Sequence, residues 1–284
     1  MRVDRYQNTG NEDQAVTRRC IGDHAGGRYE IQVVSTDSAL TGIESEWDRL
    51  ARQAAPTNPF VHPVWISAWW RAFGDRARLH LLAVRDQGRL VGVLPLMYSR
   101  AWVYGIPVRR LGAISNDHTP RFDLVARPDA DGLHEAIWHD LMRINDRWDM
   151  LELPRLCTSS PSLRRFRALA QASGCRVGTW HGPESPLVPV TRTWSEYVAS
   201  RSSNLRKNLR RKIRRLGREA QLDLEICSSA QCLEQALADS FRIEAASWKG
   251  RGGTAMESQP LVFQFYSELA AALVDQDRLC LHFL

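Results

Sequence analysis

The strongest constraint on the fold is that short strand-like segments alternate along the chain with longer helix-like segments. Apolar residues alternate over residues 29–34 as in a strand, and they recur at helical spacing over residues 43–54. Two strand-like runs, 79–85 and 89–99, are joined by the turn Asp86-Gln87-Gly88, which predicts a β-hairpin. This alternation is typical of an α/β fold in which helices cover a mixed sheet.

The predicted order is β-α-α-β-β-β-α-β-α-β-β, followed by a shorter β-α-α-β series. The further helices are predicted at 63–73, 133–145, 163–172, 231–248 and 261–274, and the further strands at 108–114, 122–126, 150–153, 176–180, 187–190, 222–227 and 279–284. Each series has an aromatic helix before an Arg-Leu strand, Arg78-Leu79 and Arg278-Leu279. This agreement indicates an internal repeat, although a chance match of amphipathic segments stays open.

Three regions follow from these patterns. Residues 1–28 mix charges and glycine without an apolar core, which predicts a disordered N-terminal tail and no signal peptide. Residues 29–192 are expected to form an N-terminal lobe, and residues 193–284 a basic helix with an incomplete C-terminal lobe. No apolar run approaches the ~18–20 residues that cross a bilayer, so no membrane span is expected.

The positive charge is concentrated in one segment. The net charge is +6, yet residues 201–218 hold nine basic residues and no acidic one, and elsewhere acidic residues slightly outnumber basic ones. The spacing of its apolar residues predicts an amphipathic helix over 203–218, with an apolar stripe docked on a core and the cations facing outward. The stripe consists of Leu205, Leu209, Ile213 and Leu216.

The cationic face has three interpretations. It can be a solvated surface, a site for phosphates or acidic sugars, or a nucleic-acid contact. Nucleic-acid binding is the least favoured, because such modules usually add exposed aromatic residues or a recognisable motif. The anion-binding candidates are Arg206, Lys207, Arg210 and Arg211.

The six cysteines are scattered and form no Cys-x-x-Cys motif. No histidine lies at metal-ligand spacing beside Cys227 and Cys232. The pattern therefore predicts free thiols, no metal site and a cytoplasmic protein.

Four segments carry a resemblance to known transferases: 60–65 (FVHPVW), 88–96 (GRLVGVLPL), the basic run 206–216, and 246–250 (ASWKG). The element order resembles the GNAT acyltransferase fold, the doubling resembles the two-lobed Fem-type transferases, and the residues are similar to the CelD-like group. The resemblance implies two tandem GNAT-like lobes, each a mixed sheet flanked by helices, with the second lobe incomplete.

The resemblance also implies an activity. An acyl group passes from acyl-CoA, such as acetyl-CoA, to an amine or hydroxyl; Fem-type relatives use an aminoacyl-tRNA. The acceptor would be a small molecule or saccharide precursor of polysaccharide or cell-envelope metabolism. Catalysis is then mostly alignment of two substrates, often with a carboxylate or histidine that takes the proton. The oligomeric state stays open.

The sequence departs from the family in its phosphate-binding loop. GNAT proteins hold the donor's pyrophosphate with an Arg/Gln-x-x-Gly-x-Gly/Ala loop that opens a helix. Residues 109–114 come closest but end in Ile114. We therefore expect a non-acylating first lobe, a second lobe that ends before its cofactor loop, and no turnover by this chain alone. The alternative is a non-enzymatic anion or nucleic-acid binding module that uses the helix at 203–218.

The candidate site residues lie in two places. Asp117 and His118, with Asp123 beyond them, form a polar cluster between strands that suits substrate contact or a general base, although turn chemistry also explains it and is favoured. Trp248 and Lys249 precede a glycine-rich stretch and could cover a substrate, or they could simply end a helix. The catalytic candidates are Asp117, His118 and Glu244, and the substrate-binding candidates besides the helix cations are Asp123, Trp248 and Lys249.

Overall fold

The computed structural model describes residues 16–20, 28–184, 186 and 188–284. Its strands are β1 (Val16–Cys20), β2 (Tyr29–Val34), β3 (Arg78–Leu79), β4 (Leu81–Asp86), β5 (Arg89–Leu94), β6 (Leu96–Val103), β7 (Ile106–Ala113), β8 (Val125–Ala126), β9 (Met150–Glu152), β10 (Glu225–Cys227) and β11 (Leu281–Phe283). Its α-helices are α1 (Asp37–Ala54), α2 (Pro63–Phe73), α3 (Leu133–Arg143), α4 (Pro161–Ala172), α5 (Trp194–Ala199), α6 (Ser203–Glu219), α7 (Ala230–Ala246), α8 (Trp248–Arg251) and α9 (Pro260–Val274), and short 3-10 turns occur at Pro59–Val61, Asn145–Arg147 and Met256–Ser258. The fold class is mixed α/β, as the sequence predicted.

Three sheets organise these elements. One has the strand order β1-β2-β4-β5-β8, a second has β3-β6-β7-β9, and β10 pairs with β11. The predicted turn between β4 and β5 forms, with positive φ at Gln87 (49°) and Gly88 (79°), the conformation that two-residue hairpins require. Only β7 and β9 pair in parallel among the described strand pairs.

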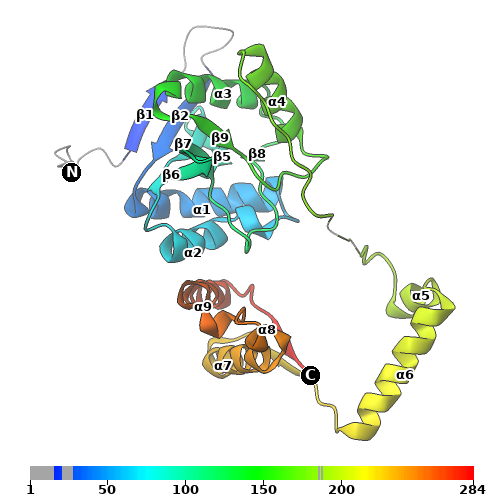
Figure 1. Ribbon diagram of the computed structural model, residues 1–284. Coiled ribbons are helices and arrows are strands. Elements are labelled where there is room, and N and C mark those ends of the chain that lie inside the picture. The colour runs from blue at the N-terminus through cyan, green and yellow to red at the C-terminus, as the bar shows by residue number, and fades with distance from the viewer. Residues whose placement is uncertain (1–15, 21–27, 185, 187) are drawn as a thin grey trace.

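Helices cover both faces of the first sheet (Figure 1). Along β4, Leu81 and Ala83 pack with α1 and α2, whereas Leu82 and Val84 pack with α3. Successive strand residues point to opposite faces, and both sets are apolar here, so β4 is buried from both sides. Residues 29–172 thereby form one unit, which we call the N-terminal unit.

Two series of elements, one in this unit and one near the end of the chain, are alike in order. Apart from β3 before β4 and α8 before α9, β2-α1-α2-β4 and β10-α7-α9-β11 have the same order of helices and strands, and in both the two outer strands pair antiparallel. The second long helix of each series begins with proline, Pro63 in α2 and Pro260 in α9. Pro is favoured at a helix start because its missing N–H has no partner there in any case. We call residues 225–284 the C-terminal unit.

The two units pack through α2 and α9. Phe265 on α9 is fully buried, with its ring 5.2 Å from that of Trp65 and 5.5 Å from that of Phe73 on α2. Arg71 on α2 also pairs with Glu268 on α9 at 2.9 Å. The aromatic rings join the two hydrophobic surfaces into one core.

The basic helix α6 differs from the prediction. The helix forms over Ser203–Glu219, capped by the Ser202 side chain, but no residue of it is buried. The apolar stripe was predicted to dock on a core, and it is exposed instead. The reason is that α7 packs on α9 and α9 packs on α2, while α5 and α6 stand apart from both units (Figure 1).

Two further predictions about local structure were wrong. Strands predicted at 176–180 and 187–190 are absent from the described residues there, which form an irregular, largely exposed segment. Cys227 and Cys232 were predicted to be free thiols and instead form a disulfide. The end of β10 and the first turn of α7 bring their Cα atoms to 5.8 Å, a separation that suits this bond.

The predicted disordered tail lies mostly outside the described residues. Its described part contains β1, which pairs antiparallel with β2. The expectation of disorder therefore does not hold for Val16–Cys20, since their backbone joins the edge of the first sheet.

We predict that Phe265→Ala lowers the free energy of unfolding by about 3–5 kcal/mol, because it leaves a cavity between the two units. Urea unfolding followed by circular dichroism measures the change. The control is Phe263→Ala on the same helix, whose ring is 42% exposed and contacts Phe241 within the C-terminal unit. Equal losses in the two variants would contradict the central role of Phe265.

Candidate functional site

A loop of the N-terminal unit carries His118 to the junction with the C-terminal unit. The Asn116 side chain accepts a hydrogen bond from the His118 backbone N–H at 3.0 Å, which closes a tight turn after β7. Trp65 on α2 donates from its indole nitrogen to the hydroxyl of the fully buried Thr119 at 3.3 Å. The loop is therefore fixed on α2, and the position of His118 is set by both contacts.

The His118 ring is enclosed by aromatic side chains from both units. It lies parallel to the Phe73 ring, with centroids 6.1 Å apart, and edge-on to Tyr266 of α9. Its Nδ1 is 3.2 Å from the Tyr266 hydroxyl oxygen. A neutral imidazole that carries its proton on Nδ1 donates to the phenol oxygen, so this contact orients the ring and leaves Nε2 as its acceptor atom.

A second polar pair approaches Tyr266 from within the C-terminal unit. The Glu244 carboxylate on α7 pairs with the Lys249 ammonium on α8 at 2.5 Å, and its other oxygen accepts from the Met256 backbone N–H at 2.7 Å. Burial acts to raise the pKa of Glu244, but the hydrogen bonds from Lys249 and Met256 outweigh it and hold this pKa below its ordinary value. Glu244 is thus an ionised carboxylate with both oxygens engaged.

A glycine determines where Lys249 lies. A Cβ atom at Gly250 would fall 1.7 Å from the Ala245 carbonyl oxygen, so α8 can approach the end of α7 this closely only with glycine at that position. The helix predicted over 231–248 breaks at Ser247, which caps α8 instead. This break turns Lys249 back toward Glu244.

Four residues therefore form what we call the junction cluster: His118, Glu244, Lys249 and Tyr266. Burial raises the pKa of Tyr266. The charge of Lys249 acts to lower this pKa, and the charge of Glu244 acts to raise it, so both charged groups lie within electrostatic reach of the phenol. The structure brings together three residues that the sequence analysis named, His118, Glu244 and Lys249. Tyr266 was missed, because an aromatic residue in an amphipathic helix reads as core.

The arrangement can take up and stabilise a proton. His118 is only partly buried and can accept a proton from a bound acceptor group, while Tyr266 stays protonated at neutral pH. The ammonium of Lys249 can stabilise negative charge that develops nearby. Glu244 is better suited to holding Lys249 than to acting as a base, since both its oxygens already accept hydrogen bonds.

Other predicted site residues lie elsewhere. The Asp117 side chain is 97% exposed and pairs with Arg155 at 2.6 Å. Asp123 accepts a hydrogen bond from the Leu124 backbone N–H at 2.8 Å. Trp248 lies on α8 with 67% of its surface exposed. None of these contacts joins the junction cluster.

The four helix cations point into solvent on α6. Arg206 donates to the Ala199 carbonyl, and Arg211 donates to the Asn208 side chain within the same helix. Lys207 and Arg210 are exposed. The junction cluster is built from α7, α8, α9 and the loop after β7, so the basic helix contributes nothing to it.

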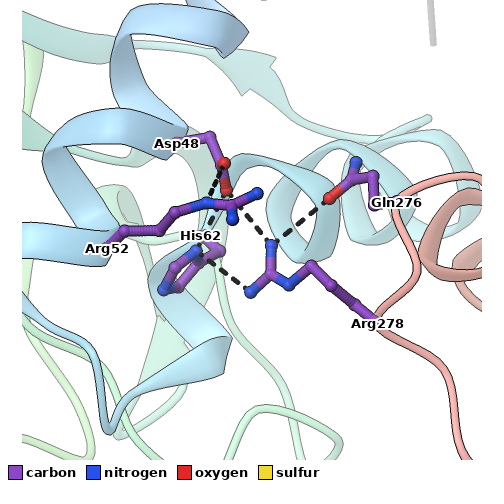
Figure 2. A network of polar contacts seen from close by, with 5 residues as sticks. All are labelled: Asp48, Arg52, His62, Gln276 and Arg278. Carbon is purple, nitrogen blue, oxygen red and sulfur yellow. Dashed lines mark hydrogen bonds and ion pairs between the residues drawn. The ribbon is translucent and has the colours of Figure 1, made fainter.

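A second set of polar contacts ties the end of the chain to the N-terminal unit (Figure 2). Arg278 reaches from the segment after α9 to Asp48 on α1, at 3.1 Å, and to Nδ1 of His62 at the start of α2, at 3.4 Å. The Gln276 side-chain oxygen accepts a hydrogen bond from Arg278, and Arg52 donates one to Asp48. We call these five residues the clasp.

The clasp surrounds a buried histidine. Burial lowers the pKa of His62, and the charge of Arg278 adds to this, although Asp48 and a hydrogen bond to the backbone of Ala55 act in the opposite direction. Burial acts to raise the pKa of Asp48, but hydrogen bonds from Arg52 and His62 hold this pKa below its ordinary value. Nδ1 of His62 lies 3.2 Å from Asp48 and 3.4 Å from Arg278, so it donates to the carboxylate when the ring proton is on Nδ1 and accepts from the guanidinium when the proton is on Nε2.

Two kinds of site are absent from the described part of the chain. No group of three or more His, Cys, Asp or Glu side chains there could hold a metal ion. No described helix combines the length and the apolar character needed to cross a membrane.

Comparisons with known proteins point to one family. Residues 203–284 match the family described as acetyltransferase (GNAT) domain, a range that begins with α6 and ends after β11. No curated protein matches the chain. The C-terminal part of the chain is thus similar to a GNAT acetyltransferase domain.

Solved structures show weaker likenesses. One is a ribosomal-protein-alanine N-acetyltransferase from Brucella melitensis biovar Abortus, at 16% identity and TM-score 0.36, covering 56% of this chain and 99% of that one. An acetyltransferase from Trypanosoma brucei has 20% identity and TM-score 0.33, with 56% and 99% covered. An aminoglycoside N-acetyltransferase in complex with CoA has 16% identity and TM-score 0.33, with 58% and 96% covered. Similarity at these TM-scores is too low to transfer a site.

We predict that stability falls as the pH drops below about 6.5, the ordinary histidine pKa. The pKa of His62 is lowered in the folded chain, so the unfolded chain binds more protons in this range and the free energy of unfolding rises with pH. The slope is at most about 1.4 kcal/mol per pH unit for each such histidine. Urea unfolding between about pH 7 and pH 5 measures it, and His62→Gln should flatten it.

The control for this prediction is His134→Gln. Burial also lowers the pKa of His134, so this variant should flatten the slope as well. Only His62→Gln should speed hydrogen exchange in the segment around Arg278, because His134 has no contact with the clasp. An unchanged slope in both variants would contradict the assignment.

Proposed function

We propose that this chain serves in GNAT-type acyl transfer, in which an acyl group passes from acyl-CoA to an amine or hydroxyl of a small acceptor. The observation that carries the proposal is the match of residues 203–284 to the acetyltransferase (GNAT) domain family. The junction cluster adds support, since it offers a partly buried histidine beside a phenol and an ammonium group.

Each member of the junction cluster has a proposed role. His118 takes the proton of the acceptor as the acceptor attacks the thioester carbonyl, the carbon–sulfur bond breaks and CoA leaves as the thiolate. With its ring proton on Nδ1, His118 donates to the Tyr266 hydroxyl oxygen, and the lone pair of Nε2 is then free to receive that proton. Lys249 stabilises the developing negative charge, and Glu244 is a positioning residue that holds Lys249.

Repetition of the fold supports a proposed double-lobe architecture. The two β-α-α-β series share their order, their antiparallel strand pairing and the proline that starts the second long helix. Their second long helices, α2 and α9, pack on each other, and His118 meets Tyr266 at this contact. In this proposal the site belongs to both lobes together.

The loop between β8 and α3 does not have the phosphate-binding pattern of the family. The loop between β8 and α3 is a strand-to-helix loop that ends in glycine, at Gly132. It carries Asp129, which binds Arg127 through two hydrogen bonds of 2.6 and 2.8 Å, and Asp131 lies just before the glycine. In the pocket at this loop Asp86 and Asp129 pair with Arg28 and Arg127, and Arg89 lines it as well, so most of its charges are already paired within the protein. We therefore assign the donor to no particular residue, and the predicted lack of turnover by the chain alone stays a prediction.

Following the CelD-like resemblance, we propose a saccharide or cell-envelope precursor as the acceptor. Amino sugars should then be better acceptors than peptide amines. A preference for peptide amines would contradict the proposed acceptor class without touching the proposed reaction. The cytoplasmic location stays a prediction that the Cys227–Cys232 disulfide does not support, because disulfides are rare in reducing compartments.

The test combines donor binding with turnover of the purified chain. We expect millimolar acetyl-CoA to raise the thermal melting temperature, because a ligand that binds only the folded state stabilises it. Any release of CoA with an amine acceptor should fall at least about 100-fold in His118→Asn, the typical contribution of a general base. The control is His139→Asn, which alters an exposed histidine on α3.

The outcomes separate the parts of the proposal. If the folded chain is not stabilised by acetyl-CoA and also releases no CoA, this result would contradict acyl transfer. Turnover that survives in His118→Asn would contradict the role of His118 alone. Rapid turnover by the unmodified chain would contradict only the predicted inactivity.

A further inference from the structure

The helix α6 presents two chemically distinct faces, and neither is covered by the described chain. At 100° per residue, its four stripe leucine and isoleucine residues fall within an arc of about 80°. All basic residues of the helix except Arg206 and Lys212 lie on the opposite half. The stripe stays open to solvent, with Leu205 50%, Ile213 56% and Leu216 40% exposed.

Exposure of this stripe is costly, and a second copy of the helix is a poor cover for it. Apolar area left in water forgoes the free energy that burial would provide. Two copies of α6 packed along their stripes would bring Arg206 and Lys212, the cations that flank the stripe, close to the same cations of the other copy, and Glu219 is the acidic residue of the helix. A suitable partner must be apolar next to the stripe and negatively charged around it.

Aromatic residues extend the same chemistry to α5, immediately before α6. Trp194 is 66% exposed, and its ring lies 5.8 Å from that of Tyr197 in a nearly parallel orientation. Arg201 lies over the Tyr197 ring at 4.7 Å. Tryptophan and tyrosine beside cations are the residues that gather where a bilayer meets water, because their rings are amphipathic.

We propose that α5 and α6 form a peripheral docking surface for an anionic lipid bilayer. The helix would lie in the plane of the headgroups, with its stripe between the acyl chains and its flanking cations among the phosphates. Arg206 and Lys212 flank the stripe on either side and would contact the headgroups. The more distant cations add a long-range attraction to the negative surface.

Nucleic acid fits these observations less well. A nucleic-acid backbone would satisfy the basic face through its phosphates, but it would leave the stripe in water. The two partners therefore differ in their dependence on the stripe, and this difference is measurable.

The test is co-sedimentation of the full 284-residue chain with vesicles of phosphatidylcholine alone or mixed equally with phosphatidylglycerol. We expect binding only to the anionic vesicles. Leu205→Gln, Leu209→Gln and Ile213→Gln together keep the charge and the helix propensity, and should weaken binding at least about 10-fold. Arg206→Gln, Arg210→Gln and Arg211→Gln together should weaken it about 100-fold at low salt.

A matched control changes charge elsewhere. Arg76→Gln, Arg164→Gln and Arg167→Gln remove the same charge from exposed positions of the N-terminal unit and should leave vesicle binding nearly unchanged. Circular dichroism of each variant checks that it remains folded, which we expect because α6 packs on neither unit.

Three results would overturn the proposal. The first is no binding to anionic vesicles by the folded chain. The second is binding that the stripe variant retains in full, which would indicate attraction by charge alone. The third is tight binding of a single-stranded or duplex oligonucleotide, insensitive to the stripe variant and in preference to vesicles, which would make nucleic acid the partner.

Discussion

The packing of α9 on α2 is the contact on which the rest of this structure depends. Phe265 fills the space between Trp65 and Phe73, and its burial fixes the helix that carries Tyr266. Only with α9 in this position does the Tyr266 hydroxyl reach His118, and the segment that follows brings Arg278 to Asp48 and His62. An apolar contact thus positions two polar networks, because a buried aromatic residue gains more from burial than an exposed ion pair does from its charges.

Much of the local structure could be predicted from the sequence, and its long-range contacts could not. The β4–β5 hairpin and α2 follow from signals within a few residues: Gln87-Gly88 for the turn, and Pro63 and Gly74 at the ends of the helix. His118 and Tyr266, in contrast, are 148 residues apart, and no pattern in either neighbourhood specifies the partner. The same holds for the clasp, where Arg278 and Asp48 are 230 residues apart.

The wrong predictions share a physical cause. The stripe of α6 has the periodicity of a core-facing helix, but periodicity reports only that a helix has an apolar face and says nothing of what covers it. Cys227 and Cys232 were interpreted from their scatter along the chain, whereas their pairing depends on the turn between β10 and α7. In both cases a local pattern was correct and the tertiary surroundings decided the outcome.

The segment between α4 and α5 has a consequence for how the molecule holds together. The described contacts between the two units run through α2 with α9, through His118 with Tyr266 and through the clasp, and none of them involves a described residue of the range 173–192. This segment therefore behaves as a tether: it sets the local concentration of one unit around the other, while the fit between them is encoded in the units themselves. Cleavage at this point would leave two fragments able to remain associated, and a longer insertion there would be tolerated, since each doubling of a flexible loop costs only about 0.6 kcal/mol.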